Sequence, residues 1–116
     1  MTRPIPRPIY KILGAREWSL AEARGHYEGS EVDRRDGYIH LSTAPQVEET
    51  ARRHFADRQD LVLVAVDTGA LHGLAWEPSR GGALFPHLYG HLPVSAARWS
   101  KPIRWNGETL VLPDLD

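Results

Sequence analysis

The chain has no cysteine among its 116 residues, which excludes disulfides, thiol catalysis and cysteine metal sites. Its longest apolar run, residues 61–66, is far shorter than the roughly 20 residues of a membrane-spanning helix. The formal net charge is only −1, so the basic footprint of a nucleic-acid-binding protein is missing. The N-terminus lacks the apolar core of a signal peptide. These absences predict a cytoplasmic protein with neither a membrane nor a nucleic-acid partner.

What remains is the composition of an ordinary soluble domain, with 41% hydrophobic and 25% charged residues. A chain of this length is large enough for one core without covalent staples. Residues 1–8 contain Pro4, Pro6 and Pro8 and are expected to form an extended lead-in. Residues 9–116 are then expected to form a single globular domain, with no internal repeat.

Hydrophobic periodicity and turn residues predict about six strands and about two helices. Residues 61–66 are a β-branched apolar run, typical of a central strand that is buried on both faces. Asn106-Gly107 is a strong hairpin signal. Thr43 and Gln46 have the spacing of a capping box at the start of a helix. The expected strands are 9–13, 38–42, 61–66, 74–77, 94–99 and the hairpin formed by 103–105 and 108–112. The expected helices are 18–24 and the segment that follows Thr43. Residues 29–37 and 78–90 are expected to form loops.

The order of these elements favours the α+β class. The helices come early in the chain and most of the strands come late, whereas a doubly wound α/β sheet alternates the two. The order of the strands within a sheet does not follow from this pattern.

The first polar motif is residues 36–43, in which His40 and Ser42 alternate with Ile39 and Leu41. On a strand, this period of two places His40 and Ser42 on one face. An imidazole and a hydroxyl both donate and accept hydrogen bonds, so together they suit a ribose or an amide. The alternative is a histidine satisfied inside the fold and a serine that caps the next helix.

The second polar motif covers residues 77–90. Arg80 with Gly81 and Gly82 can bring a guanidinium and backbone N–H groups close to an anion. The segment that includes His87 and Tyr89 offers aromatic rings that could stack on a flat base or nicotinamide. The alternatives are a plain surface turn and a loop that closes the end of the core.

Two other readings of the polar residues are weaker. His87 and His91, with His40, could ligate zinc, but a four-residue spacing suits ligation best on a helix, and Gly90 and Pro93 disfavour a helix there. We therefore predict no metal site. A hydrolase that uses Ser42, His87 and Asp36 is formally conceivable, but the sequence has no nucleophile elbow.

These motifs carry a family resemblance. The matching segments are Ile-Tyr-Lys-Ile at 9–12 with Trp18, Asp-Gly-Tyr-Ile-His-Leu-Ser-Thr at 36–43, residues 60–63 with Asp67, and Phe-Pro-His-Leu-Tyr-Gly at 85–90. Over roughly residues 9–100 the chain resembles the bacterial family called domain of unknown function 952. The resemblance implies an ADP-ribosyltransferase-like fold, a mixed or antiparallel split sheet with a central cleft that binds NAD in the enzymes.

The resemblance also implies roles for particular residues. His40, Ser42 and Glu77 are the expected catalytic group, with Glu77 placed to stabilise developing positive charge. The expected ligand-binding residues are Tyr10, Lys11, Arg80, His87 and Tyr89. Lys11 stands where the family commonly has histidine, and an ammonium suits a phosphate better than a developing cation.

Three functional hypotheses follow. The first is a cleft that binds a nucleotide-like small molecule, of the NAD or ADP-ribose type, without turnover. The second is an ADP-ribosyltransferase-like enzyme with NAD as substrate. The third is a structural or partner-binding protein whose polar segments only close the core. No cofactor other than NAD is suggested by the sequence.

Overall fold

The computed structural model describes residues 8–115, except for the side chain of Arg80. Apart from Pro8, the expected lead-in at residues 1–8 lies outside the described residues. The described chain is α+β, as predicted, and its strands pair antiparallel. None of the helices within residues 8–115 is long and apolar enough to cross a membrane.

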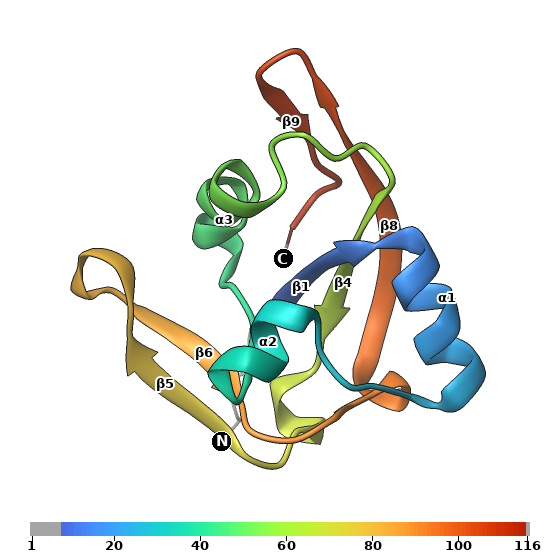
Figure 1. Cartoon of the computed structure of the whole chain (residues 1–116), viewed down its shortest axis with the longest axis vertical. Coiled ribbons are helices and arrows are strands. Elements are labelled where there is room, and N and C mark those ends of the chain that lie inside the picture. The colour runs from blue at the N-terminus through green and yellow to red at the C-terminus, as the bar shows by residue number, and fades with distance from the viewer. Residues whose placement is uncertain (1–7, 116) are drawn as a thin grey trace, which may run out of the picture.

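Three sheets and three short α-helices make up the described fold (Figure 1). The largest sheet has the order β1-β4-β8-β9, a second has the order β3-β6-β5, and β2 pairs with β7. The strands are β1 (Ile9–Gly14), β2 (His26–Tyr27), β3 (Ile39–His40), β4 (Leu61–Val66), β5 (Leu74–Pro78), β6 (Leu84–Leu88), β7 (Leu92–Pro93), β8 (Ala97–Asn106) and β9 (Thr109–Val111). The helices are α1 (Ala15–Arg24), α2 (Glu31–Asp36) and α3 (Val47–His54), with 3-10 turns η1 (Ala44–Gln46), η2 (Thr68–Ala70), η3 (Arg80–Gly82) and η4 (Val94–Ala96).

Strand β4 is the centre of the core, because alternate residues enter two different hydrophobic clusters. Val64 and Val66 pack on the side of α1 and the second sheet, where they meet Trp18, Ile39 and Leu88. On the opposite face, Leu61, Leu63 and Ala65 pack with Val47 and Ala51 of α3 and with Trp105 of β8. This confirms the predicted central strand, buried on both faces.

Strand β1 is an edge of the largest sheet, and there the two larger sheets come together. Tyr10 of β1 and Ser42, just past β3, exchange backbone hydrogen bonds of 2.8 and 2.9 Å. Helix α2 lies in front of β1, and the β5–β6 hairpin projects away from it (Figure 1). Residues of β1 from both faces of the sheet can therefore line the space beside this edge.

Residues 29–37, expected to be a loop, contain helix α2. Its sequence carries little apolar periodicity, which is why the pattern predicted a loop. The helix is stabilised instead by a capping box: the Ser30 hydroxyl accepts from the Asp33 N–H, and the Asp33 carboxylate accepts from the Ser30 N–H. The loop prediction was wrong because capping, rather than apolar periodicity, stabilises this short helix.

The expected loop at residues 78–90 was also wrong in its second half, which is strand β6. The turn is confined to the segment between β5 and β6, where Ser79 and Ala83 are joined by a 2.9 Å backbone hydrogen bond. His87 therefore lies on the central strand of the second sheet, directly opposite His40 of β3. The site is built from paired strands rather than from a strand and a loop.

Other boundaries differ from the predictions. Helix α1 begins at Ala15, directly after β1, so Ser19 lies inside the helix and does not cap it. The expected strands 94–99 and 103–105 are a turn, η4, followed by one long strand, β8. Pro102 is tolerated within β8 because β9 pairs only from Arg104 onward. The expected strand at 38–42 is shorter, with only Ile39 and His40 in β3.

Two turn predictions are confirmed. Thr43 and Gln46 form a capping box, with the Gln46 Oε1 accepting from the Thr43 N–H at 3.0 Å. Asn106 and Gly107 connect β8 to β9, and Gly107 has a φ of 64°. Gly107 thus adopts the left-handed conformation that such tight turns require.

Gly73 fixes how the chain enters β5, and we predict that Gly73→Ala destabilises the protein. Gly73 has a φ of +86°, and an added Cβ would overlap the carbonyl oxygen of Tyr89. We expect a loss of about 1–3 kcal/mol in the free energy of unfolding, measured by urea denaturation. Gly69→Ala is the matched control, since the nearest atom to its added Cβ is Asp67 Oδ1 at 3.4 Å. Equal stability of the two variants would contradict the prediction.

Candidate functional site

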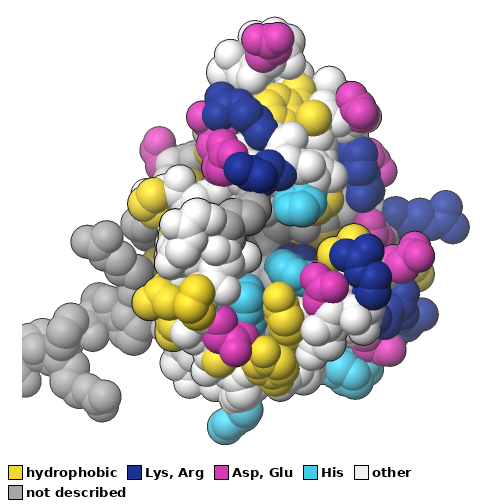
Figure 2. Space-filling view, turned by 60° about the vertical axis from the view of Figure 1, so that its left-hand side comes forward, with side chains coloured by type: hydrophobic (Ala, Val, Ile, Leu, Met, Phe, Trp, Pro, Cys, Tyr) yellow, Lys and Arg dark blue, Asp and Glu magenta, His cyan; other side chains and the backbone are white. Residues whose placement is uncertain are grey.

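A cleft of about 610 Å³ lies beside the edge of β1 that faces the second sheet. It is lined by residues of β1, α2, β3 and β6, by the polar face of α3, and by the loop that follows α3. Figure 2 shows histidine side chains gathered around this hollow, and His40, His54 and His87 are among its lining residues. Acidic and basic side chains are mixed around it, so the cleft is polar and carries charges of both signs.

The floor of the cleft is organised by Asp33, whose carboxylate is almost completely buried. Its Oδ2 accepts from Lys11 Nζ at 2.9 Å and from the Ser30 N–H at 2.9 Å. Its Oδ1 accepts from the His40 N–H at 3.1 Å and contacts His40 Nδ1 at 2.6 Å. Lys11 also donates to the carbonyl oxygen of His40 at 2.9 Å. These bonds join β1, α2 and β3 at one point.

The protonation states of this pair follow from its surroundings. Burial by itself raises the pKa of Asp33, but the hydrogen bond from His40 and the charge of Lys11 outweigh burial and hold that pKa well below its usual range. Burial lowers the pKa of Lys11, and the charge of Asp33 opposes that shift. Asp33 is therefore held in its charged form at neutral pH, and its lone pairs are occupied by the protein itself.

His40 is held between two carboxylates. Its Nδ1 faces Asp33, and its Nε2 lies 3.0 Å from Asp36 Oδ2. Each ring nitrogen of His40 therefore has a carboxylate oxygen within 3.0 Å. The His40 side chain is 34% exposed, which leaves the ring within reach of a ligand in the cleft.

A second histidine cluster lies on the neighbouring strand. His87 Nδ1 is 2.8 Å from Glu77 Oε1, and the Tyr89 hydroxyl donates to the same oxygen at 2.7 Å. The hydrogen bonds from Tyr89 and then from His87 lower the pKa of Glu77. Tyr38 stacks on the His87 ring with centroids 4.0 Å apart and also contacts His40 at 4.6 Å. His87 is therefore enclosed, with an exposed side-chain fraction of only 4%.

Ser42 and Tyr10 complete the wall beside β1. The Ser42 and Thr50 hydroxyls are 2.9 Å apart, which connects the end of β3 to α3. Tyr10 is fully buried and contacts the Trp99 ring, with centroids 6.0 Å apart. Both residues line the cleft, and both are buried in the fold.

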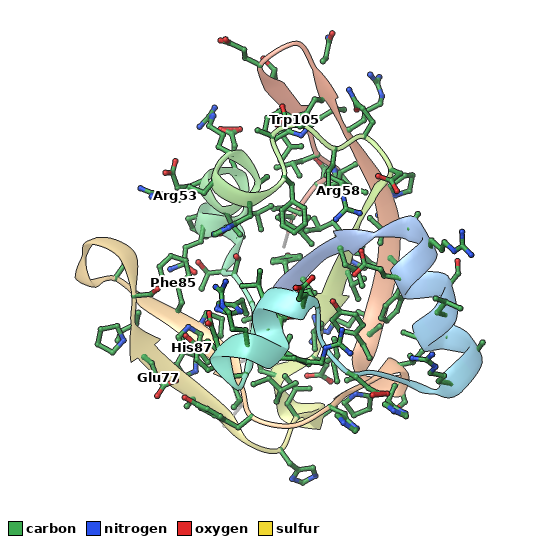
Figure 3. The ribbon with its side chains drawn as sticks, viewed as in Figure 1. Arg53, Arg58, Glu77, Phe85, His87 and Trp105 are labelled. Carbon is green, nitrogen blue, oxygen red and sulfur yellow. The ribbon has the colours of Figure 1, made fainter. Side chains whose placement is uncertain are left out.

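The structure brings together five of the predicted site residues as cleft lining: Tyr10, Lys11, His40, Ser42 and His87. In Figure 3, His87 and Phe85 come from the β6 side and Arg58 from the far side of the cleft. Glu77 and Tyr89 do not line the cleft and act on His87 from outside. Arg80 begins η3 at the turn of the β5–β6 hairpin, and its side chain lies outside the described residues.

Sequence reasoning missed Asp33, the residue on which the site depends. It also missed Tyr38, whose ring lies against His87 and His40. The capping-box spacing from Ser30 could have indicated Asp33. His54, at the end of α3, and Arg58, in the loop that follows, also line the cleft, and nothing in the sequence distinguishes them from ordinary surface residues. The sequence assigned Asp36 only to the hydrolase alternative, with Ser42 and His87.

Neither alternative catalytic arrangement is assembled. No group of three or more histidines and acids within the described residues is placed to hold a metal ion, and His91 stacks on His26 instead of joining His40. The residues of the hydrolase alternative, Ser42, His87 and Asp36, also bond to other partners rather than to one another. His87 pairs with Glu77, and the Ser42 hydroxyl contacts Thr50.

The fold and the cleft define a small α+β protein with a histidine- and carboxylate-rich cleft where two antiparallel sheets meet. The sequence model of "Protein of unknown function (DUF952)" matches residues 12–100, and the chain belongs to this family. The chain is similar to protein CC0527 from Caulobacter crescentus, whose crystal structure shows 47% identity, covers 87% of this chain and 90% of that chain, and has a TM-score of 0.84.

The solution NMR structure of CC0527 shows 46% identity over 89% of this chain and 90% of that chain, with a TM-score of 0.78. No curated protein matches the chain. The comparisons therefore establish the family that the sequence motifs indicated, and the fold is similar to that of CC0527.

We predict that Asp33→Asn strongly destabilises the fold. The variant leaves the buried ammonium of Lys11 without its counter-charge, and breaking a buried ion pair from one side costs about 3–5 kcal/mol. The measurement is the free energy of unfolding from urea denaturation at neutral pH. Asp36→Asn is the matched control: its carboxylate is 31% exposed, so we expect a change of about 1 kcal/mol or less. Similar losses in both variants would contradict the prediction.

We also predict that the stability supplied by Asp33 is lost in acid. Because its pKa is lowered in the folded state, its contribution is fully present above the unfolded value of about 3.9 and falls as pH drops from there through the folded pKa. The gap in unfolding free energy between wild type and Asp33→Asn should therefore shrink below about pH 4. A gap that stays constant from about pH 7 to about pH 3 would show that the Asp33 carboxylate is not preferentially ionised in the fold.

Proposed function

We propose that the cleft binds a nucleotide-like small molecule of the NAD or ADP-ribose type. The observation that carries this proposal is the convergence of polar side chains from β1, β3 and β6 on one cleft of about 610 Å³. Sites for small molecules are usually clefts of roughly 300–1,000 Å³ with a few well-placed polar groups. The polar groups here are fixed in advance by Asp33 and Glu77, so little ordering is needed on binding.

Aromatic surface in the cleft supports recognition of a flat ring. Tyr38 and Phe85 both line the cleft, and Tyr38 is held in place by its stacking on His87. An adenine or nicotinamide ring gains roughly 1–3 kcal/mol from stacking on an aromatic side chain. Tyr38 takes the stacking role that the sequence assigned to Tyr89, which does not line the cleft.

Positive charge and hydroxyl groups support recognition of ribose and phosphate. Arg35 and Arg58 line the cleft together with His40, and guanidinium groups bind phosphate oxygens in a forked geometry. The Ser42 and Thr50 hydroxyls lie on the same wall and suit a ribose.

The second candidate is an ADP-ribosyltransferase-like enzyme. It includes the ADP-ribosyltransferase-like fold that the family resemblance implies. The observation in its favour is that Lys11, His40 and Ser42 line one cleft from β1 and from the end of β3. Glu77, the expected stabiliser of positive charge, is instead bonded to Tyr89 and His87 outside the lining. Binding without turnover therefore ranks first.

The test is a calorimetric titration of the protein with NAD and with ADP-ribose. We expect saturable binding to wild type and binding weakened about tenfold or more in His40→Ala, because a charge-assisted hydrogen bond contributes about 1.5–3 kcal/mol. His72→Ala is the matched control, since His72 is exposed and does not line the cleft.

Circular dichroism confirms that each variant is folded before it is titrated. Release of nicotinamide from NAD in the same samples would move the transferase to first place. An absence of heat with both ligands, from folded wild-type protein, would contradict the proposal. Loss of stability in His40→Ala, again without any ligand heat, would then favour a structural or partner-binding role.

A further inference from the structure

The carboxylate of Asp36 lies in the cleft lining, close to the side-chain nitrogens of Arg35 and His40. Its Oδ1 accepts from Arg35 Nε at 3.3 Å, and its Oδ2 lies 3.0 Å from His40 Nε2. Both Arg35 and His40 line the cleft, as does Asp36 itself. A carboxylate of the protein thus occupies the position in which the Arg35 guanidinium and the His40 ring would hold an oxyanion of a ligand.

The two carboxylates on His40 differ in how firmly they are held. Asp33 is 2% exposed and accepts bonds from three different residues, Lys11, Ser30 and His40. Asp36 is 31% exposed, and its partner Arg35 is 72% exposed. Ion pairs in water contribute little because solvent already stabilises the separate charges. His40 therefore has one permanent partner at Nδ1 and one exchangeable partner at Nε2.

We infer that this end of the cleft is a subsite for a phosphate or diphosphate group, which replaces the Asp36 carboxylate on His40 and Arg35. The inference rests on the proposed function and names the part of the ligand that the site recognises. Both side chains suit this chemistry, because a guanidinium forms short, strong bonds to phosphate oxygens and an imidazole N–H can donate to them. Lys11 is already paired with Asp33, so we do not expect its ammonium to bind the phosphate in place of His40 and Arg35.

The test compares wild type with Asp36→Asn, which keeps the shape of the side chain and removes its charge. Both proteins are titrated with ADP-ribose, inorganic pyrophosphate and adenosine. We expect Asp36→Asn to bind ADP-ribose and pyrophosphate about two- to fivefold more tightly, in proportion to the small stabilisation that an exposed ion pair provides. Adenosine, which has no phosphate, should bind the two proteins equally.

Two further variants separate a local effect from a change in net charge. Glu108→Gln removes one negative charge at the β8–β9 turn, where Glu108 is exposed and outside the cleft lining. It should bind all three probes as wild type does. Arg35→Gln removes one of the two donors, and it should weaken ADP-ribose and pyrophosphate binding and reduce their dependence on salt.

The outcomes distinguish this inference from the proposed function. Equal affinity of ADP-ribose for wild type, Asp36→Asn and Glu108→Gln would overturn the subsite and leave the proposed function standing. Tighter pyrophosphate binding by Asp36→Asn, with no heat from ADP-ribose or adenosine, would support the subsite and remove the nucleotide from the proposed function. An absence of binding of every probe to either protein would overturn both.

Discussion

The buried carboxylate of Asp33 is the constraint on which the site depends. A charge this deeply buried is tolerated only when it is paired and hydrogen-bonded, and its partners come from three separate elements: Lys11 on β1, Ser30 before α2 and His40 on β3. Each element must therefore stay at a fixed distance and angle to the others. The ion pair sets the position of α2 over the edge of β1, and that position shapes the cleft.

The same constraint gives the two cleft histidines different characters. His40 and His87 are cross-strand neighbours on one face of the second sheet, and each has a carboxylate at Nδ1. Tyr38 then lies flat on His87 and tilted against His40. His87 becomes part of the wall, while His40 keeps a nitrogen directed at an exposed partner. The anchored pair thus presents one imidazole to solvent and uses the other to hold the aromatic surface.

The parts of this architecture that rest on local patterns could be predicted from the sequence. The apolar run at 61–66, the turn at Asn106-Gly107 and the alternation of His40 with Ser42 each reflect a rule that acts over a few residues. The parts that depend on distant partners could not. Lys11 and Asp33 are 22 positions apart, and α2, a short polar helix, is stable because its third residue is bonded to β1 and β3.

The bonding of Asp33 also limits what chemistry the cleft can perform. A carboxylate that already accepts from Lys11, Ser30 and His40 has no lone pair directed at a ligand, so Asp33 positions His40 and takes no proton from a substrate. Because Asp36 Oδ2 lies 3.0 Å from the opposite nitrogen, both ring nitrogens of His40 already have a carboxylate neighbour. An imidazole that is fixed at one nitrogen and faces an exposed carboxylate at the other matches the anion-binding role proposed for this end of the cleft.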